Sequence, residues 1–466
     1  MKIYNSLTGK KQQFTPITPG KVKMYACGIT VSGEAHIGHA YQALIYDIII
    51  KYLEKKGYEV TYARNYTDVD DKIIAKSNET GIPADIYAEE MIKNIDEQMA
   101  RLAVDDPTIW IKATQCIDDI IDFTATLIKK GYAYATDKGD VYFSVESFPS
   151  YGKLSHRNLD DALNGVRVTN DEEKKNPLDF ALWKSAKEGE PSWHSPWGEG
   201  RPGWHIECST MNYKTFGEQI DIHGGGRDLI FPHHENEIAQ TEALTGKPFA
   251  AFWIHNGLIK VNGQKMSKSL GNSLFLKDLL DKYGNETIKL ALLQTNYRGD
   301  INVTDNLFPD AEKHLYDFYK VFKAAEDADI ELSGQYPEID EQFNSCMDDD
   351  FNTALAISNL YGYFKKARAM VANGDKAVGA YLAQIKKTYS LLGLFRADAT
   401  EFVNAYDQKH AVNLADFPAE VVALADERFE AKKNKDWGKA DALRAQIAEL
   451  GYEVKDSKDG YTLIKK

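Results

Sequence analysis

The sequence predicts an α/β protein with a parallel sheet, followed by a helical region and a small mixed segment. The stretch "KVKMYACGIT" (21–30) is typical of a strand, and "HIGHAYQALIYDIIIKYLEKKG" (36–57) of a long amphipathic helix. The stretch "YEVTYARNYTDVDD" (58–71) is typical of a second strand followed by an acidic turn. A strand, a helix and a strand in this order favour two parallel strands joined by a helical crossover. From about 311 to 395 the apolar pattern is helical throughout, and the last sixty residues form a shorter mixed element.

The residues between these regions suggest an insertion and a hairpin. Segments within about 116–200, such as "EGEPSWHSPWGEGRPG", are rich in aromatic residues, Ser and Pro, and we interpret this stretch as an insertion with its own small fold. A strand, a loop and a helix return in "GEQIDIHGGGRDLIFPHHENEIAQTEALTG" (217–246). In "LIKVNGQKM" (258–266), apolar runs flank Asn262-Gly263, which is a strong signal for a two-residue hairpin.

Composition limits the class of protein. The chain has 466 residues with a formal net charge of −14, 43% hydrophobic and 27% charged residues, as in ordinary globular proteins. No apolar run approaches the roughly 20 residues that span a bilayer, and the first residues lack the apolar core of a secretion signal. Four scattered cysteines do not suggest a disulfide framework. We therefore expect a cytoplasmic protein without a membrane segment.

The stretch "HIGH" (36–39) places two histidines at the start of the expected helix. Free backbone N–H groups and the helix dipole favour anions there, so phosphate is a natural ligand. His36 and His39 lie three apart on one face and could donate to the same phosphate. Gly38 has no side chain, so a flat ring such as adenine could lie against its backbone. The alternative is a pair of half-exposed histidines without a ligand.

A second candidate is "KMSKSLGN" (265–272), directly after the expected hairpin. Lys265 and Lys268 lie in a loop that contains Ser and Gly, and such a loop can bring ammonium groups onto a triphosphate as charge develops. The alternative is a solvated basic turn.

A third candidate is a set of cysteine, histidine and carboxylate side chains. His233 and Glu237 are at i and i+4 of an expected helix, and the two cysteines each lie at an expected strand end or turn. Thiolate, imidazole and carboxylate groups together form a plausible zinc site. The candidate ligands are Cys27, Cys208, His233 and Glu237. Competing ligands are His223 and His234, and the alternative to a metal site is two buried cysteines and a surface His/Glu pair.

These motifs resemble those of a known family. "HIGH" and "KMSKS" are similar to the signature pair of class I aminoacyl-tRNA synthetases. Within that class, the chain resembles cysteinyl-tRNA synthetase over nearly its whole length. The stretches that carry this resemblance are "CGIT", "NYTDVDDKII", "RPGWHIECS", "DIHGGGRDLIFPHHENEIAQ", "KMSKSLGN" and "NKDWGKADALRAQIAELGYEVKDSKDG".

The resemblance implies roles for individual residues. The zinc ligands of the family correspond to the four candidate ligands above. Lys268 corresponds to the lysine that contacts ATP, with Lys265 as its helper. Trp204 matches a tryptophan near the side chain of the amino-acid substrate, and Asp228 matches an acidic residue that could receive the substrate ammonium.

The resemblance also implies an activity. Cysteine would attack the α-phosphate of ATP to form cysteinyl-adenylate, and the terminal adenosine of tRNA would then take the cysteinyl group. The implied partners are tRNA(Cys), L-cysteine and ATP; the implied cofactors are one Zn²⁺ per chain and Mg²⁺ with ATP; the implied state is a monomer. Trp437, with lysines around it in "KNKDWGKAD", is either a base-stacking platform for the anticodon or part of a core.

The implied fold is a Rossmann-type parallel-sheet catalytic domain with an inserted connective domain, followed by a helical bundle and a small mixed C-terminal domain. The expected ranges are 1–115 and 201–258 for the two halves of the catalytic domain, 116–200 for the insertion, 259–310 for the KMSKS loop and stem-contact region, 311–405 for the bundle and 406–466 for the anticodon-binding domain. In the bundle, the acidic "MDDDFNTALA" (347–356) is expected to cap a helix rather than bind metal.

Departures from the family pattern lie near the first motif. Ser32 and Gly33 replace a usual aromatic-acidic pair, and Tyr41 replaces a basic residue. Two other functions remain possible from the sequence. One is an ATP-dependent cysteine ligase with a non-tRNA acceptor, and the other is a non-catalytic, zinc-stabilised RNA-binding module.

Overall fold

The computed structural model describes residues 1–157, 173–266, 271–410, 414–456 and 460–465. The chain forms two compact units, Met1–Arg396 and Ala397–Lys466, and each is described by itself. In the part of the chain that the structure describes, no helix combines the length and the apolar character that a membrane span requires.

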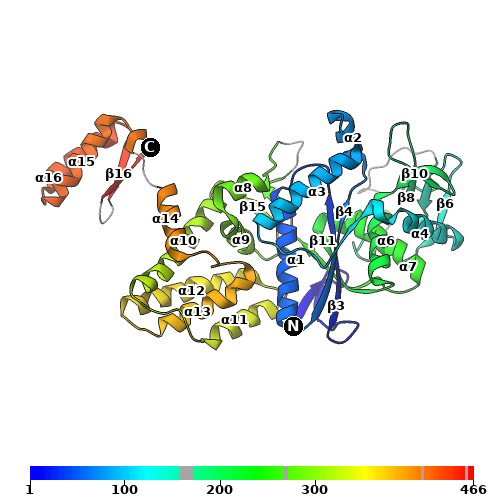
Figure 1. Ribbon diagram of the computed structural model, residues 1–466, viewed down its shortest axis with the longest axis horizontal. Coiled ribbons are helices and arrows are strands. Elements are labelled where there is room, and N and C mark those ends of the chain that lie inside the picture. Colours follow the sequence, from blue (N-terminus) through cyan, green and yellow to red (C-terminus); the bar gives the residue numbers. More distant parts are fainter. Residues whose placement is uncertain (158–172, 267–270, 411–413, 457–459, 466) are drawn as a thin grey trace. The chain divides into compact units, whose positions relative to one another are not determined.

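A five-stranded parallel sheet forms the centre of the first unit (Figure 1). Its strand order is β12-β11-β3-β4-β5, and every neighbouring pair is parallel. The strands are β3 (Lys21–Thr30), β4 (Glu59–Thr67), β5 (Ile109–Lys112), β11 (Ile220–Gly226) and β12 (Ala250–Asn256). This confirms the predicted α/β class with a parallel sheet.

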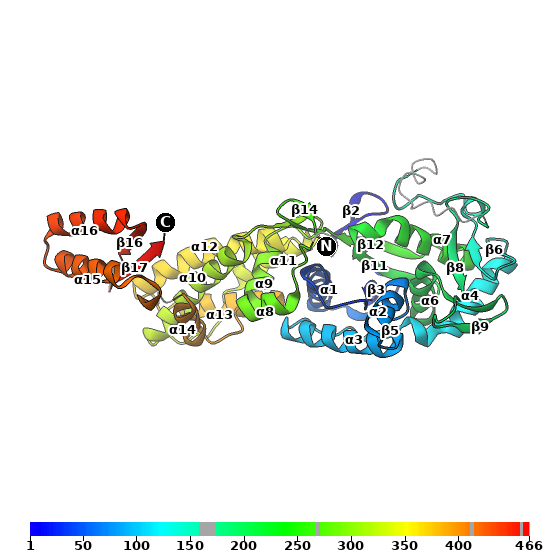
Figure 2. The same cartoon turned by 90° about the horizontal axis from the view of Figure 1, so that it is seen from above.

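Helices cover both faces of this sheet. The crossover from β3 to β4 is α1 (Ile37–Lys55), which confirms the long helix expected after residue 36. Figures 1 and 2 show α1 on one side of the sheet and α6 (Trp204–Phe216) and α7 (Glu235–Thr245) on the other. Two further helices, α2 (Asp71–Thr80) and α3 (Ala84–Arg101), connect β4 to β5.

The segment between β5 and α6 carries a second, antiparallel sheet in the order β6-β7-β8-β10-β9. Its elements are α4 (Ile117–Lys129), β6 (Ala133–Ala135), β7 (Val141–Phe143), β8 (Phe180–Ser185), β9 (Trp193–Ser195) and β10 (Gly198–Pro202). Phe143 and Trp183 of this sheet belong to the same buried cluster as Ala63 and Trp253 of the parallel sheet. The two sheets therefore share one continuous core.

After β12 the chain forms the expected hairpin. Strands β13 (Ile259–Val261) and β14 (Gln264–Lys265) are antiparallel, and Asn262 and Gly263 have φ of 48° and 81°. Positive φ at both central residues is what a type I′ turn requires, so the prediction from Asn-Gly is confirmed. β13 also pairs with β15 (Ile301–Val303) in parallel, and α8 (Leu276–Tyr283) and α9 (Asn285–Leu293) lie between them in sequence.

A group of helices completes the first unit. They are α10 (Leu307–Asp327), α11 (Pro337–Asp348), α12 (Thr353–Ala372) and α13 (Val378–Tyr389), and the N-terminal strands β1 (Lys2–Asn5) and β2 (Lys10–Gln13) form a separate antiparallel pair. The Asn352 side chain accepts a hydrogen bond from the N–H of Leu355 (3.0 Å) at the start of α12. This confirms that the "MDDDFNTALA" stretch caps a helix.

The second unit is the small mixed element expected at the C-terminus. It contains α14 (Ala399–Lys409), α15 (Ala419–Lys433), α16 (Trp437–Glu449) and the antiparallel strands β16 (Tyr452–Asp456) and β17 (Tyr461–Lys465). Its core is small, formed by Val421, Ala425, Ile447, Val454 and Leu463. Arg428 and Asp456 form a two-pronged ion pair (2.6 and 3.0 Å) that ties α15 to β16.

Candidate metal centre and nucleotide site

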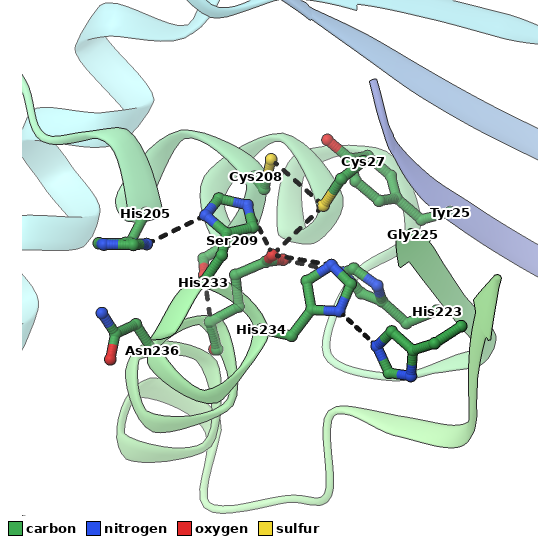
Figure 3. Close-up of polar contacts among 12 residues, drawn as sticks. Tyr25, Cys27, His205, Cys208, Ser209, His223, Gly225, His233, His234 and Asn236 are labelled. Atoms are coloured by element: carbon green, nitrogen blue, oxygen red, sulfur yellow. Dashed lines mark hydrogen bonds and ion pairs between the residues drawn. The ribbon is translucent and has the colours of Figure 1, made fainter. Parts of the chain in front are cut away.

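The structure brings the four candidate metal ligands together from four elements. Their donor atoms all lie within 4.8 Å of one another, and all four side chains are buried. Figure 3 shows the Cys27, Cys208 and His233 side chains turned toward one point. Cys27 lies in β3, Cys208 in α6, His233 in the irregular turn η4 (Ile230–His234) and Glu237 in α7.

The expected position of Cys208 at a strand end or turn is wrong, because Cys208 lies inside α6. This helix is buried on most sides between the sheet and α7, so its sequence has no clear apolar stripe. Without such a stripe, the 3.6-residue period that identifies an amphipathic helix is absent.

Cys27 is positioned by an irregularity in β3. The pairing of β3 with β4 shifts register between Ala26 and Ile29. Within this bulge, the N–H of Gly28 donates to the Asn65 side chain (2.8 Å), and a Cβ at residue 28 would lie 1.6 Å from the Asn65 carbonyl oxygen. Bulges redirect side chains next to sites, and only glycine fits here.

The contacts among the four groups explain their protonation. The Cys27 and Cys208 sulfurs are 3.7 Å apart, and Oε1 of Glu237 is 3.3 Å from the Cys27 sulfur and 3.0 Å from Nε2 of His233. A hydrogen bond from Cys27 lowers the pKa of Cys208 to about 6, whereas burial and the Cys208 sulfur raise the pKa of Cys27 well above its ordinary value.

The imidazole and the carboxylate form a buried pair. Although burial disfavours its charge, the Glu237 carboxylate raises the pKa of His233 to about 10. Burial opposes ionisation of Glu237, but His223 and His233 hold its pKa well below the usual range. Cys208 and Glu237 are therefore anionic at neutral pH, while Cys27 and His233 keep their protons. Such a donor set, with two sulfurs, one nitrogen and one oxygen, fits a divalent zinc ion.

The competing histidines contact the same carboxylate from another side. Nε2 of His223 donates to Oε2 of Glu237 (2.8 Å), and Nδ1 of His234 is 2.8 Å from Nε2 of His255. Cys27, His223 and His234 also form a possible three-ligand group. Because Nε2 of His223 already donates to Glu237, His223 is placed to orient this ligating carboxylate rather than to bind the metal itself.

Sequence reasoning missed several residues that support the site. Asn65 and His255 are named above, and Nδ1 of His205 lies 3.0 Å from Nδ1 of His233. Burial lowers the pKa of His205 well below its ordinary value. His205 precedes Cys208 by three residues, so helical spacing could have suggested it. For Asn65 the sequence offers no such signal.

The two residues expected near the substrate lie close in sequence to two of the candidate ligands, Trp204 four residues before Cys208 and Asp228 five residues before His233. Trp204, 37% exposed, stacks on the His233 ring with centroids 4.3 Å apart. Asp228 is exposed in the short 3-10 turn η3 (Arg227–Leu229), and a Cβ at Gly226 would lie 2.7 Å from its Oδ1. The Asp228 carboxylate thus lies against the end of β11.

His36 and His39 form a reciprocal cap on α1. Nδ1 of His36 accepts from the N–H groups of Gly38 (3.1 Å) and His39 (3.4 Å), and Nδ1 of His39 accepts from the N–H of His36 (3.4 Å). The rings stack 3.6 Å apart. Because Nδ1 accepts in both neutral rings, each carries its proton on Nε2. Both side chains can therefore donate from Nε2.

The segment that follows the second signature motif lies beside the first motif. The N–H of Ile37 donates to the Leu274 carbonyl and the N–H of Leu276 to the Ala35 carbonyl, both at 2.9 Å. The chain just after the second motif is thereby tied to the first motif. Lys268 lies outside the described residues, and the backbone of Lys265 pairs with Lys260 in the hairpin.

The sequence left two alternatives for Trp437, a base-stacking platform or a place in a core, and the structure does not place it in a core. Its side chain is 59% exposed at the first position of α16.

Comparisons with known proteins agree with this architecture. Residues 13–313 match the family model described as the tRNA synthetases class I (C) catalytic domain, 342–396 match a DALR domain, and 414–462 match a cysteinyl-tRNA ligase anticodon binding domain. The chain is 46% identical to a cysteine–tRNA ligase of Geobacter metallireducens, over 99% of both chains. It is 45% identical to that of Syntrophotalea carbinolica, over 99% of this chain and 98% of the relative.

Solved structures show the same fold at low identity. Methionyl-tRNA synthetase of Mycobacterium tuberculosis with methionyl-adenylate matches with a TM-score of 0.60 at 13% identity, covering 82% of this chain and 93% of that chain. A ternary complex of Agrobacterium radiobacter LeuRS matches with a TM-score of 0.58 at 12% identity, covering 86% of both chains.

Proposed function

The chain belongs to the cysteine–tRNA ligase family of class I aminoacyl-tRNA synthetases, and we propose that the site described above carries out the two steps of this ligation. In the first step, L-cysteine and ATP give cysteinyl-adenylate and pyrophosphate. In the second, the cysteinyl group passes to the 3′-terminal adenosine of tRNA(Cys). Transfer chemistry of this type depends mainly on alignment and on neutralisation of charge.

In this proposal Cys27, Cys208, His233 and Glu237 hold one zinc ion. Their mutual distances and donor chemistry support it. Packing alone separates two substrates that differ by one atom by only about 1–3 kcal/mol, which is too little to distinguish cysteine from serine. When bound, zinc would hold the substrate sulfur as a thiolate, for which a serine hydroxyl is no equivalent.

The chain's own residues would orient the amino acid beside this ion. Trp204 covers the His233 ring and presents an apolar face near the ligand group. Asp228, at the end of β11, supplies the negative charge that a substrate ammonium requires. His223 keeps the Glu237 carboxylate in place through its hydrogen bond.

The nucleotide would bind at the start of α1. In this proposal the base would lie against the Gly38 backbone, while the Nε2–H groups of His36 and His39 and the N-terminus of the helix would donate to the phosphates. Lys265, the last residue of β14, and Lys268, three positions later in the sequence, would add positive charge, with Mg²⁺ accompanying ATP. The hydrogen bonds from Ile37 and Leu276, which join the two motifs, support this arrangement.

The acceptor separates this proposal from its alternative. A cysteine ligase with a small acceptor would need no second unit, whereas the exposed Trp437 beside lysines suits stacking on an unpaired base. The domain ranges expected from the sequence, with a bundle at 311–405 and an anticodon-binding domain at 406–466, are part of the proposal. The monomeric state and the cytoplasmic location stay predictions.

The decisive experiment is charging of tRNA(Cys) with labelled cysteine, in competition with serine. The wild-type chain should charge cysteine and exclude serine. Cys208→Ala should lose zinc and much of that preference. Cys116→Ala is the matched control, because Cys116 is equally buried and belongs to no ligand group among the described residues. A zinc-free protein that still preferred cysteine would refute the role of the metal.

A further inference from the structure

Residues 294–300, which connect α9 to β15, touch three separate parts of the first unit. The Tyr41 hydroxyl of α1 donates to the Tyr297 carbonyl (3.1 Å), and the N–H of Gly257 donates to the same oxygen (2.8 Å). The Tyr297 hydroxyl in turn donates to the buried Asp350, between α11 and α12 (2.8 Å). The first-motif helix, the strand that follows β12 and the helical bundle therefore meet at this connection.

Asp300, at the end of the connection, joins two further segments through one carboxylate. Its Oδ1 accepts from the N–H of Leu258 (3.0 Å), and its Oδ2 pairs with Nζ of Lys260 (3.0 Å). Both partners belong to the chain that enters the β13–β14 hairpin. The same carboxylate forms an ion pair with Arg227, the first residue of η3. Arg227 also donates to the Arg298 carbonyl (3.4 Å).

The contact between residues 257–260 and 298–300 is tightly packed, and the Asp300 carboxylate within it stays charged. A Cβ at Gly257 would lie 1.9 Å from the Gly299 carbonyl oxygen, so the two backbones are in direct contact. Asp300 is only 22% exposed, which disfavours its charge, but the Leu258 N–H, Lys260 and Arg227 keep its pKa below the ordinary value. The carboxylate is therefore ionised at neutral pH and holds both cations.

We propose that Asp300 is a positioning residue that sets the β13–β14 hairpin relative to η3. This inference rests on the proposed function, in which η3 carries Asp228 for the amino acid and β14 ends at Lys265 for the nucleotide. The two substrates must meet with their reacting atoms aligned, and a misplacement of about 1 Å can cost roughly 100-fold in rate. One carboxylate that contacts both segments fixes their separation.

The test is cysteine-dependent ATP–pyrophosphate exchange with each substrate varied. Arg227→Gln should raise the KM for cysteine, Lys260→Met the KM for ATP, and Asp300→Asn both, with kcat/KM falling about tenfold or more for each substrate. In the double variant Arg227→Gln with Asp300→Asn, the fall in kcat/KM for cysteine should not exceed the fall in Asp300→Asn alone. Melting temperatures should change by no more than about 2 °C, because the Arg227 and Lys260 side chains are 45% and 42% exposed and ion pairs to such cations contribute little stability.

The matched control is Asp281→Asn. Asp281 also pairs with two cations, Arg101 and Lys277, on the surface of the first unit, and its loss should leave both KM values unchanged. Unchanged kcat/KM for both substrates in Asp300→Asn, or a fall in kcat that only follows the folded fraction, would overturn the inference. If Asp300→Asn melted early, Arg227→Gln, which keeps the Leu258 bond, would carry the test through its KM for cysteine. Absence of exchange in the wild type would instead refute the proposed function.

Discussion

At the metal centre, neighbouring groups determine which donors carry protons. Cys208 and Glu237 are ionised at neutral pH, with the pKa of Cys208 at about 6, while Cys27 and His233 keep their protons because their pKa values are raised, that of His233 to about 10. Zinc binds deprotonated ligands only. The two retained protons must therefore leave when the ion binds.

We expect zinc binding to the metal-free protein at pH 7 to release about two protons. Since Cys27 and His233 stay protonated in the metal-free protein between pH 6.5 and 8, affinity should rise by about 100-fold for each pH unit in that window. Below pH 6, protonation of Cys208 adds a third proton. Calorimetry in two buffers with different ionisation enthalpies measures the number of protons released on zinc binding. A binding enthalpy independent of the buffer would contradict this account.

Gly28 supports the site because its missing side chain lets β3 approach the Asn65 backbone of β4 closely. Gly28→Ala would place a Cβ 1.6 Å from the Asn65 carbonyl oxygen, so β3 and β4 must separate locally. We expect a loss of more than about 3 kcal/mol in unfolding free energy together with weaker zinc binding. Gly362→Ala is the control, because a Cβ there meets nothing within 4 Å. In helix α12 that change should stabilise by up to about 1 kcal/mol. Chemical denaturation measures the unfolding free energies of Gly28→Ala and Gly362→Ala.

Among the elements, α1 combines a structural and a chemical role at its first turn. His36 caps the helix through Nδ1 and, in the proposed site, donates to phosphate through Nε2. Further along, the buried Tyr41 donates to the Tyr297 carbonyl. The departure from the family pattern at residue 41 therefore anchors the helix to the connection 294–300.

The two roles of His36 can be separated by substitution. His36→Asn keeps a side chain that can cap the helix but lacks the imidazole Nε2–H that would donate to phosphate. Stability should therefore be nearly unchanged, while pyrophosphate exchange falls about 10²–10³-fold. His36→Ala should show the same loss of rate and also cost about 1 kcal/mol of stability. Thermal melts and exchange rates on both variants check this. Wild-type exchange in His36→Asn would show that the ring serves only as a cap.

At the scale of the whole molecule, the proposed function assigns activation of cysteine to the first unit and recognition of the tRNA anticodon to the second. Every proposed zinc and nucleotide residue lies within Met1–Arg396, and Trp437 lies in Ala397–Lys466. A defect confined to the second unit should therefore affect charging of tRNA without affecting activation of cysteine.

Trp437→Ala tests this division. Because the side chain is largely exposed, the fold should tolerate its loss. A stacked base is worth about 1–3 kcal/mol, so the KM for tRNA should rise roughly 5- to 150-fold while pyrophosphate exchange stays at the wild-type level. Leu450→Ala, another exposed apolar residue of the second unit, should leave both reactions unchanged. Equal tRNA kinetics in the two variants would exclude stacking by Trp437.

The sequence by itself determined the fold class, the order of elements and the family. Strands β3 (21–30) and β4 (59–67), the helix after His36 and the Asn262-Gly263 hairpin depend on local periodicity and turn chemistry, which a single stretch of chain expresses. The motif stretches are also contiguous, so they could be identified without a structure.

Only the tertiary structure decided which distant side chains meet. It placed Cys208 inside a helix, put His205 and Asn65 beside the metal group, exposed Trp437 and joined Arg227 to Lys260 through Asp300. Residues buried on all sides carry no periodic signal, and contacts across 28 to 143 positions follow from packing of the whole core rather than from local pattern. For that reason the ligand types could be inferred from the sequence, while the supporting contacts could not.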